Sequence, residues 1–165
     1  MPLARFAVAA LLLILAGCMM HVPTPPGPDF YVVRHLNTPE GVSDPDLTEE
    51  GQRNARLLAD WFTGEPPVTI FVSNTKRAQQ TAAPLAAKLG ITPIVYDPRD
   101  TPALIADVMK EPNPVLIVGH SNTVPDIVAG LGGTRPGPLV HADFGDIWHI
   151  SGPQRVTTRA KLGGS

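Results

Sequence analysis

Short apolar runs recur along the chain from residue 30 onward, and helical spacing fills most of the segments between them. The runs are too short for buried helices and predict buried strands at Phe30–Val33, Val68–Val72, Ile91–Tyr96 and Val115–Val118. Two later segments, Asp146–Ile150 and Arg155–Lys161, predict a fifth strand and an edge strand.

Helix signals separate these runs. Thr48 followed by Glu49 and Glu50 is typical of a helix start, because a hydroxyl caps the first turn and acids suit the helix dipole. Further helices are predicted at Lys76–Leu89, Thr101–Lys110 and Val124–Leu131. Strands that alternate with helices predict an α/β fold, here a three-layer sandwich with a mostly parallel central sheet.

The first residues have the pattern of a targeting signal. Arg5 precedes an apolar run, Phe6–Ala16, which is short for a membrane span and suits a signal peptide. The run leads into Leu15-Ala16-Gly17-Cys18, which resembles a bacterial lipobox. We therefore expect residues 1–17 to be a lipoprotein signal peptide and Cys18 to be lipidated. An ordinary secretory signal with an incidental cysteine is the alternative.

The segment after Cys18 predicts a spacer. Residues 18–29 contain four prolines, which favour an extended tether, and residues 30–165 are expected to form one folded domain. Met19 stands where aspartate is associated with inner-membrane retention in enteric bacteria. We therefore expect a protein of the bacterial cell envelope, lipid-anchored at the outer membrane and facing the periplasm.

Composition narrows the classes of function. The 165 residues carry a formal net charge of -2 and have no long basic run, which argues against a nucleic-acid partner. The single cysteine excludes an internal disulfide framework and a zinc ribbon.

Polar residues gather where the predicted strands end. Arg34 and His35 follow the first strand, Arg77 lies just after the second, and His120 follows the fourth. The carboxyl ends of parallel strands meet at one edge of a sheet, where ligands bind. Arginine side chains match phosphate oxygens, and no Asp/His/Cys set has metal-ligand spacing, so the residues predict a phosphate site without a metal.

Four motifs, in this order, resemble the histidine phosphatase superfamily, the phosphoglycerate-mutase-like proteins. They are Val33-Arg34-His35-Leu36-Asn37-Thr38, Leu47-Thr48-Glu49-Glu50-Gly51-Gln52-Arg53-Asn54-Ala55, Ser73-Asn74-Thr75-Lys76-Arg77-Ala78-Gln79-Gln80-Thr81-Ala82 and Val118-Gly119-His120-Ser121-Asn122-Thr123. The resemblance runs from Phe30 to about Leu162 and implies a phosphoglycerate-mutase-like fold.

The resemblance also implies a reaction. His35 would attack phosphorus and form a phosphohistidine, which water then hydrolyses. Electrostatic stabilisation of the phosphoryl group would come from Arg34, Arg77 and His120. Asn37, Thr38 and Ser121 would complete the phosphate site. No cofactor or metal would be needed, and the partner would be a phosphorylated small molecule or phosphosugar that is accessible in the envelope.

Two departures from the family pattern matter. Leu36 stands where the family usually has glycine, so the loop beside His35 is expected to differ. The proton donor also departs from the family pattern, because His120 is followed by Ser121 and not by aspartate. We assign the acid to Asp100, with Asp97 or no dedicated acid as alternatives. Asp100 as the N-cap of the next helix, or as a partner of Arg99, is the competing interpretation.

Two other functions remain open from the residues. A non-catalytic member of the same fold would bind a phosphorylated ligand in the envelope. A serine hydrolase would use Ser121 in Gly119-His120-Ser121-Asn122-Thr123, with Asp143 or Asp146 and His149 as partners. A purely structural role is the alternative for two of the site residues. Arg77 would then form an ion pair with Glu49 or Asp44, and His120 would be a core histidine.

Overall fold

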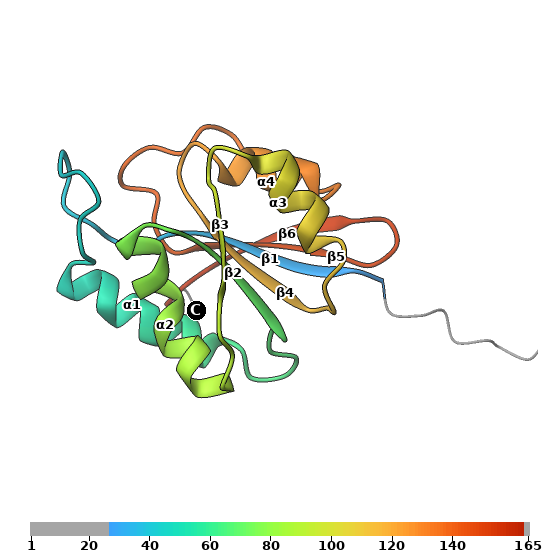
Figure 1. Cartoon of the computed structure of the whole chain (residues 1–165), viewed down its shortest axis with the longest axis horizontal. Coiled ribbons are helices and arrows are strands. Elements are labelled where there is room, and N and C mark those ends of the chain that lie inside the picture. Colours follow the sequence, from blue (N-terminus) through green and yellow to red (C-terminus); the bar gives the residue numbers. More distant parts are fainter. Residues whose placement is uncertain (1–26, 164–165) are drawn as a thin grey trace, which may run out of the picture.

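The structure, a computed structural model, describes residues 27–163 (Figure 1). Its strands are β1 (Asp29–Arg34), β2 (Thr69–Ser73), β3 (Ile94–Tyr96), β4 (Val115–Gly119), β5 (Asp146–Ser151) and β6 (Val156–Lys161). Its helices are α1 (Glu49–Trp61), α2 (Lys76–Leu89), α3 (Thr101–Val108) and α4 (Val124–Gly130). The predicted signal peptide, Cys18 and most of the predicted tether lie outside the described residues.

One sheet of six strands organises the fold, in the order β3-β2-β4-β1-β5-β6. Strands β3, β2, β4 and β1 are mutually parallel, whereas β5 and β6 run antiparallel at one side. This confirms the predicted α/β class with a mostly parallel central sheet. Strands β1, β2 and β4 therefore end at the same edge, with Arg34 opposite Gly119.

Helices cover both faces of the sheet, with α1 and α2 on one side and α3 and α4 on the other (Figure 1). Side chains of a strand alternate between faces, and β1 shows this clearly. Tyr31 and Val33 pack with Leu58 and Leu85 under α1 and α2. Phe30 and Val32 pack in the second core with residues of α3 and α4, including Leu104 and Ile127.

The predicted helix caps are present. The Thr48 hydroxyl accepts a hydrogen bond from the Gly51 N–H at 3.1 Å, and Gly90 ends α2 with φ +67°. Strand β3 is shorter than predicted, because Ile91 N–H donates to Ala86 O at the end of α2 and Pro93 has no N–H to donate. Among the helices of residues 27–163, none is long and apolar enough to span a membrane.

Helix α1 is held tightly against the loop that follows β1. The Thr48 N–H donates to the Asn37 carbonyl at 2.9 Å. A Cβ atom at Gly51 would lie 2.4 Å from that same oxygen, so glycine is required for the close approach. The start of α1 thereby fixes the loop that carries His35 and Thr38.

Candidate active site

The ends of β1, β2 and β4 bring two histidines together. His35 follows β1, and its backbone N–H donates to the Gly119 carbonyl, at the end of β4, with an N–O distance of 2.9 Å. His120 is the next residue after Gly119. The two imidazole rings lie 5.3 Å apart between centroids, and both side chains are buried at about 5–6% exposure. The strand-end prediction is confirmed for this pair.

The backbone sets the tautomer of His35. Its Nδ1 lies 3.0 Å from the Leu36 carbonyl oxygen. A carbonyl oxygen only accepts, so Nδ1 carries the hydrogen and Nε2 keeps its lone pair. Burial lowers the pKa of His35 to about 3, with smaller decreases from the neighbouring positive charges and a partial increase from the Leu36 hydrogen bond. His35 is therefore a neutral imidazole with a free Nε2, the form required of a nucleophile.

His120 is held by hydroxyl groups. The backbone N–H of His120 donates to Thr123 Oγ1 at 2.9 Å, and the imidazole Nε2 lies 2.8 Å from Ser73 Oγ. Burial, followed by the charges of Arg77 and Arg34, lowers the pKa of His120 to about 4. Its Nδ1 is buried and has no hydrogen-bond partner within the described residues. A buried nitrogen left in this way is unfavourable by about 1–3 kcal/mol, which a ligand oxygen would offset.

Arg34 is a buried cation that faces carbonyl oxygens. One guanidinium nitrogen donates to the carbonyls of Val140, His141 and Asp143 at 2.6, 3.2 and 3.1 Å. The guanidinium carbon lies 4.2 Å from the centroid of the Phe144 ring. Arg34 forms no ion pair with a carboxylate of residues 27–163, although its side chain is only 5% exposed. A buried charge without a counter-ion favours the binding of an anion.

A cavity of about 290 Å³ opens beside these groups. Arg34, His35, Thr38 and Arg77 line it together with His141 and the loop formed by residues 39–45. Arg77 forms an ion pair with Asp44 of that loop, with an N–O distance of 3.2 Å. The cavity is therefore a positively charged depression with a neutral imidazole in its wall, which suits a phosphoryl group.

Comparison with known proteins finds a family match in the segment that carries most of the site. Residues 30–99, which include Arg34, His35 and Arg77, match the profile described as histidine phosphatase superfamily (branch 1). This segment of the chain, from β1 to the loop after β3, is therefore similar to the histidine phosphatase superfamily. The resemblance inferred from the motifs is confirmed.

Solved structures show the same fold. The protein histidine phosphatase SixA complexed with tungstate matches with a TM-score of 0.59 and 20% identity, over 80% of this chain and 94% of that one. The mycobacterial glucosyl-3-phosphoglycerate phosphatase Rv2419c matches with a TM-score of 0.63 and 17% identity, over 84% of this chain and 100% of that one.

A curated relative is similar over a shorter stretch. The PE-PGRS family protein PE_PGRS11 of Mycobacterium tuberculosis is 42% identical over 72 residues, which is 38% of this chain. The chain spans only 12% of the length of that protein.

Leu36 replaces the usual glycine of the histidine phosphatase superfamily without a strained backbone. It is not among the residues with positive φ, and its side chain is buried with Leu47 and Ala55 in a small core of its own. Its N–H donates to the Thr81 hydroxyl of α2 at 2.9 Å. The leucine therefore ties the loop to α1 and α2, and its carbonyl still orients His35.

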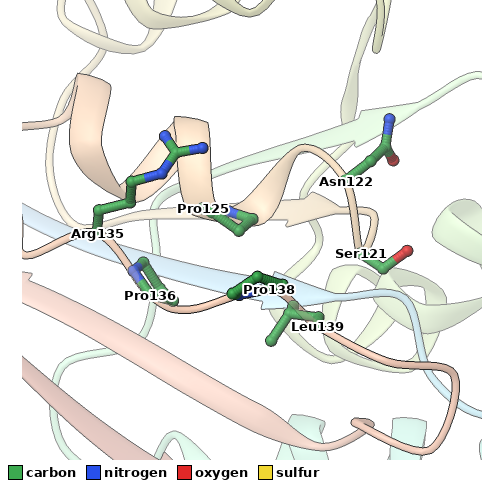
Figure 2. A pocket seen from close by; sticks show the side chains of 7 residues that line it. All are labelled: Ser121, Asn122, Pro125, Arg135, Pro136, Pro138 and Leu139. Carbon is green, nitrogen blue, oxygen red and sulfur yellow. The ribbon is translucent and has the colours of Figure 1, made fainter.

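Several predicted site residues lie away from the cavity that His35 lines. The Asn37 side chain accepts a hydrogen bond from Asn54 of α1 at 2.9 Å. Ser121 lines a separate hollow of about 340 Å³ with Asn122, opposite Arg135 and Pro136 (Figure 2). Neither Asn37 nor Ser121 is among the lining residues of the candidate phosphate cavity, whereas Thr38 is.

The two candidate acids after β3 are engaged elsewhere. Asp100 is the N-cap of α3, and its carboxylate accepts from the Ala103 N–H at 3.0 Å. Asp97, and not Asp100, pairs with Arg99, at 2.7 Å. Neither carboxylate lines the cavity. The interpretation of Asp100 as a helix cap is thus confirmed, and its role as proton donor stays a prediction that has no geometric support.

The proposed partners of a serine nucleophile are separated from one another. Asp146 pairs with Arg159 and Lys161, and His149 pairs with Asp29 at the start of β1. The Asp143 carboxylate accepts from the Val140 N–H at 2.7 Å. These contacts do not assemble a triad around Ser121.

Several groups of the site had no such role in the sequence prediction. Ser73 and Thr123 lie within the family motifs, but their contacts with His120 depend on the sheet register. Phe144 and the carbonyls near it come from a loop more than 100 residues from Arg34. Of the two partners predicted for Arg77, Glu49 and Asp44, the structure confirms Asp44, and it also places this residue at the cavity.

Proposed function

We propose that this chain is a metal-independent phosphomonoester hydrolase that forms a phosphohistidine at His35. The observation that carries the proposal is the juxtaposition of a neutral His35, with Nε2 free, and a buried Arg34 without a carboxylate partner. The structural neighbours support it, since SixA and Rv2419c are described as phosphatases.

Each residue has a distinct part in the proposed reaction. Arg34 and Arg77, which line the cavity, bind the phosphoryl oxygens. His120 does not line the cavity but lies beside His35, and its buried, unpaired Nδ1 gains an oxygen partner when the phosphoryl group binds. Ser73 Oγ lies 2.8 Å from His120 Nε2 and 3.0 Å from Thr75 Oγ1, and in the proposed reaction the Ser73 hydroxyl donates its hydrogen to His120 Nε2. Nδ1 of His120 then carries a hydrogen and is a donor. His35 Nε2 attacks phosphorus in line, and water later cleaves the N–P bond.

The substrate we propose is a phosphorylated small molecule or phosphosugar accessible in the cell envelope. The cavity of about 290 Å³ is large enough for a phosphoryl group and part of the molecule that carries it. The rest of that molecule would contact loop 39–45 and His141, which line the cavity. The two arginines supply the positive charge from side chains, so no metal is required by this proposal.

Activity is expected on 4-nitrophenyl phosphate, with inhibition by orthovanadate and no effect of EDTA. Because the pKa of His35 lies near 3 in the free protein, His35 stays neutral when the pH falls from 7 to 5. A nucleophilic histidine with the ordinary pKa of about 6.5 would lose about 25-fold in kcat/KM between pH 7 and pH 5, because protonation removes the free imidazole. We expect no such decrease for this protein. Phosphate release by the full chain in detergent tests this. Absence of turnover, or complete loss with EDTA, would contradict the proposal.

We also propose a lipid anchor at Cys18, in the outer membrane and facing the periplasm. The support is the Leu15-Ala16-Gly17-Cys18 sequence, which lies outside the described residues. Cys18→Ser is expected to abolish incorporation of an alkyne fatty acid into the protein in bacterial cells and to leave the precursor uncleaved. Incorporation at the wild-type level in Cys18→Ser would contradict the proposed lipidation of Cys18.

A further inference from the structure

The candidate site contains one carboxylate, and it comes from the loop between β1 and α1. An alkoxide leaving group needs a proton as its bond to phosphorus breaks. Asp97 and Asp100 are engaged with Arg99 and the start of α3. Of the acidic residues described by the structure, Asp44 alone lines the cavity together with His35 and Arg77.

Asp44 is held at the cavity rim by two contacts. Its Oδ1 accepts from the Lys76 N–H at 2.9 Å and from Arg77 Nη1 at 3.2 Å. Its side chain is 43% exposed, so the carboxylate faces solvent as well as the cavity. Its φ of +45° is uncommon for a residue with a side chain, and aspartate is one of the residues that tolerate it.

We propose that Asp44 is the general acid of the phosphatase reaction, an inference that rests on the proposed function. In the free protein the Asp44 carboxylate is the anion that Arg77 binds. A phosphoryl dianion that binds Arg77 takes over this role and places negative charge beside the carboxyl group. A like charge favours the protonated, hydrogen-bond-donating form of a carboxyl group. Substrate binding thus prepares Asp44 to donate.

The proposed steps balance in atoms and charge. His35 Nε2 forms a bond to phosphorus while the bond from phosphorus to the leaving oxygen breaks. That oxygen takes the proton of the Asp44 carboxyl group and departs as an alcohol. In the second step the Asp44 carboxylate accepts a proton from water, whose oxygen attacks phosphorus. The N–P electron pair returns to Nε2, and hydrogen phosphate leaves.

Asparagine is the informative substitution at this position. Asp44→Asn keeps an Oδ1 acceptor for the Lys76 N–H and tolerates the positive φ. It removes the carboxyl proton and the charge. Asp46→Asn is the matched control, because Asp46 lies in the same loop, accepts from Gln80 Nε2 at 2.7 Å and does not line the cavity.

The test compares two substrates of similar shape, phenyl phosphate and 4-nitrophenyl phosphate. Nitrophenolate leaves without a proton, whereas phenolate gains from one. Asp44→Asn should slow phenyl phosphate by about 10²–10⁴-fold and change 4-nitrophenyl phosphate by less than about threefold. Asp46→Asn should leave the ratio of the two rates at the wild-type value. The full chain in detergent is used for every variant.

The other outcomes separate the two proposals. Equal changes on both substrates in Asp44→Asn would overturn the inference, since Asp44 would then only hold Arg77 or α2. If that variant misfolds, the wild-type protein still decides. A wild-type preference for 4-nitrophenyl phosphate as steep as that of uncatalysed hydrolysis would exclude an acid and overturn the inference. No turnover of either substrate by the wild-type protein would instead overturn the proposed function and, with it, this inference.

Discussion

His35→Ala is expected to lower kcat/KM for 4-nitrophenyl phosphate by at least about 10⁴-fold and to abolish the acid-labile phosphoenzyme. His35 is the neutral imidazole in the cavity wall, with Nδ1–H bound to the Leu36 carbonyl and Nε2 left to attack. Rapid-quench labelling with ³²P-phosphate ester measures the phosphoenzyme, and phosphate release measures turnover.

The control for His35→Ala is retained anion binding. Arg34 and Arg77 remain in this variant, so orthovanadate should still raise its melting temperature. A variant that binds vanadate but does not turn over has lost the nucleophile and kept the fold. Phosphoenzyme at the wild-type level in His35→Ala would show that another residue is phosphorylated.

Arg34→Lys is expected to lower kcat/KM by about 10²–10³-fold and to weaken vanadate inhibition. The single lysine ammonium cannot reproduce the guanidinium fork, which is anchored to three carbonyls of the 140–143 loop and stacked on Phe144. The substitution keeps the charge, so the loss measures geometry.

Arg53→Lys is the matched control for Arg34→Lys. Arg53 lies on α1 with 59% of its side chain exposed, and its contact with Glu49 is long, at 4.0 Å. Such surface pairs contribute about 0–1 kcal/mol, so activity should stay at the wild-type level. A kcat/KM of Arg34→Lys within threefold of that of Arg53→Lys would show that Arg34 is not part of the phosphate site.

The local sequence pattern predicted helices and strands well where one segment contains both the residues that start the element and those that end it. Helix α2 runs from Lys76 to Leu89 as predicted, because Thr75 caps its start and Gly90 adopts the left-handed conformation at its end. The strand pattern failed at β3, which begins at Ile94 and not at the predicted Ile91. The Ile91 N–H already donates to Ala86 O at the end of α2 and Pro93 has no N–H, so neither residue extends the strand.

The expectation that ligands bind where parallel strands end also identified residues that lie together in the structure. Arg34, His35 and His120 each follow or end a parallel strand, and parallel strands end at one edge of the sheet. That expectation gives position only. It did not separate Thr38, which lines the cavity, from Asn37, whose side chain binds Asn54 of α1.

The sequence by itself therefore determined the α/β class, the helix caps and the meeting of Arg34, His35 and His120, because these follow from local periodicity and strand order. Only the tertiary structure decided the chemical state of those groups. The low pKa values of the two histidines come mainly from burial, and Arg34 is fixed by carbonyls from a distant loop. It also selected Asp44, and not Glu49, as the partner of Arg77, and it placed Asp100 at the start of α3. Burial and loop closure depend on contacts between segments far apart in the chain, and no local pattern encodes them.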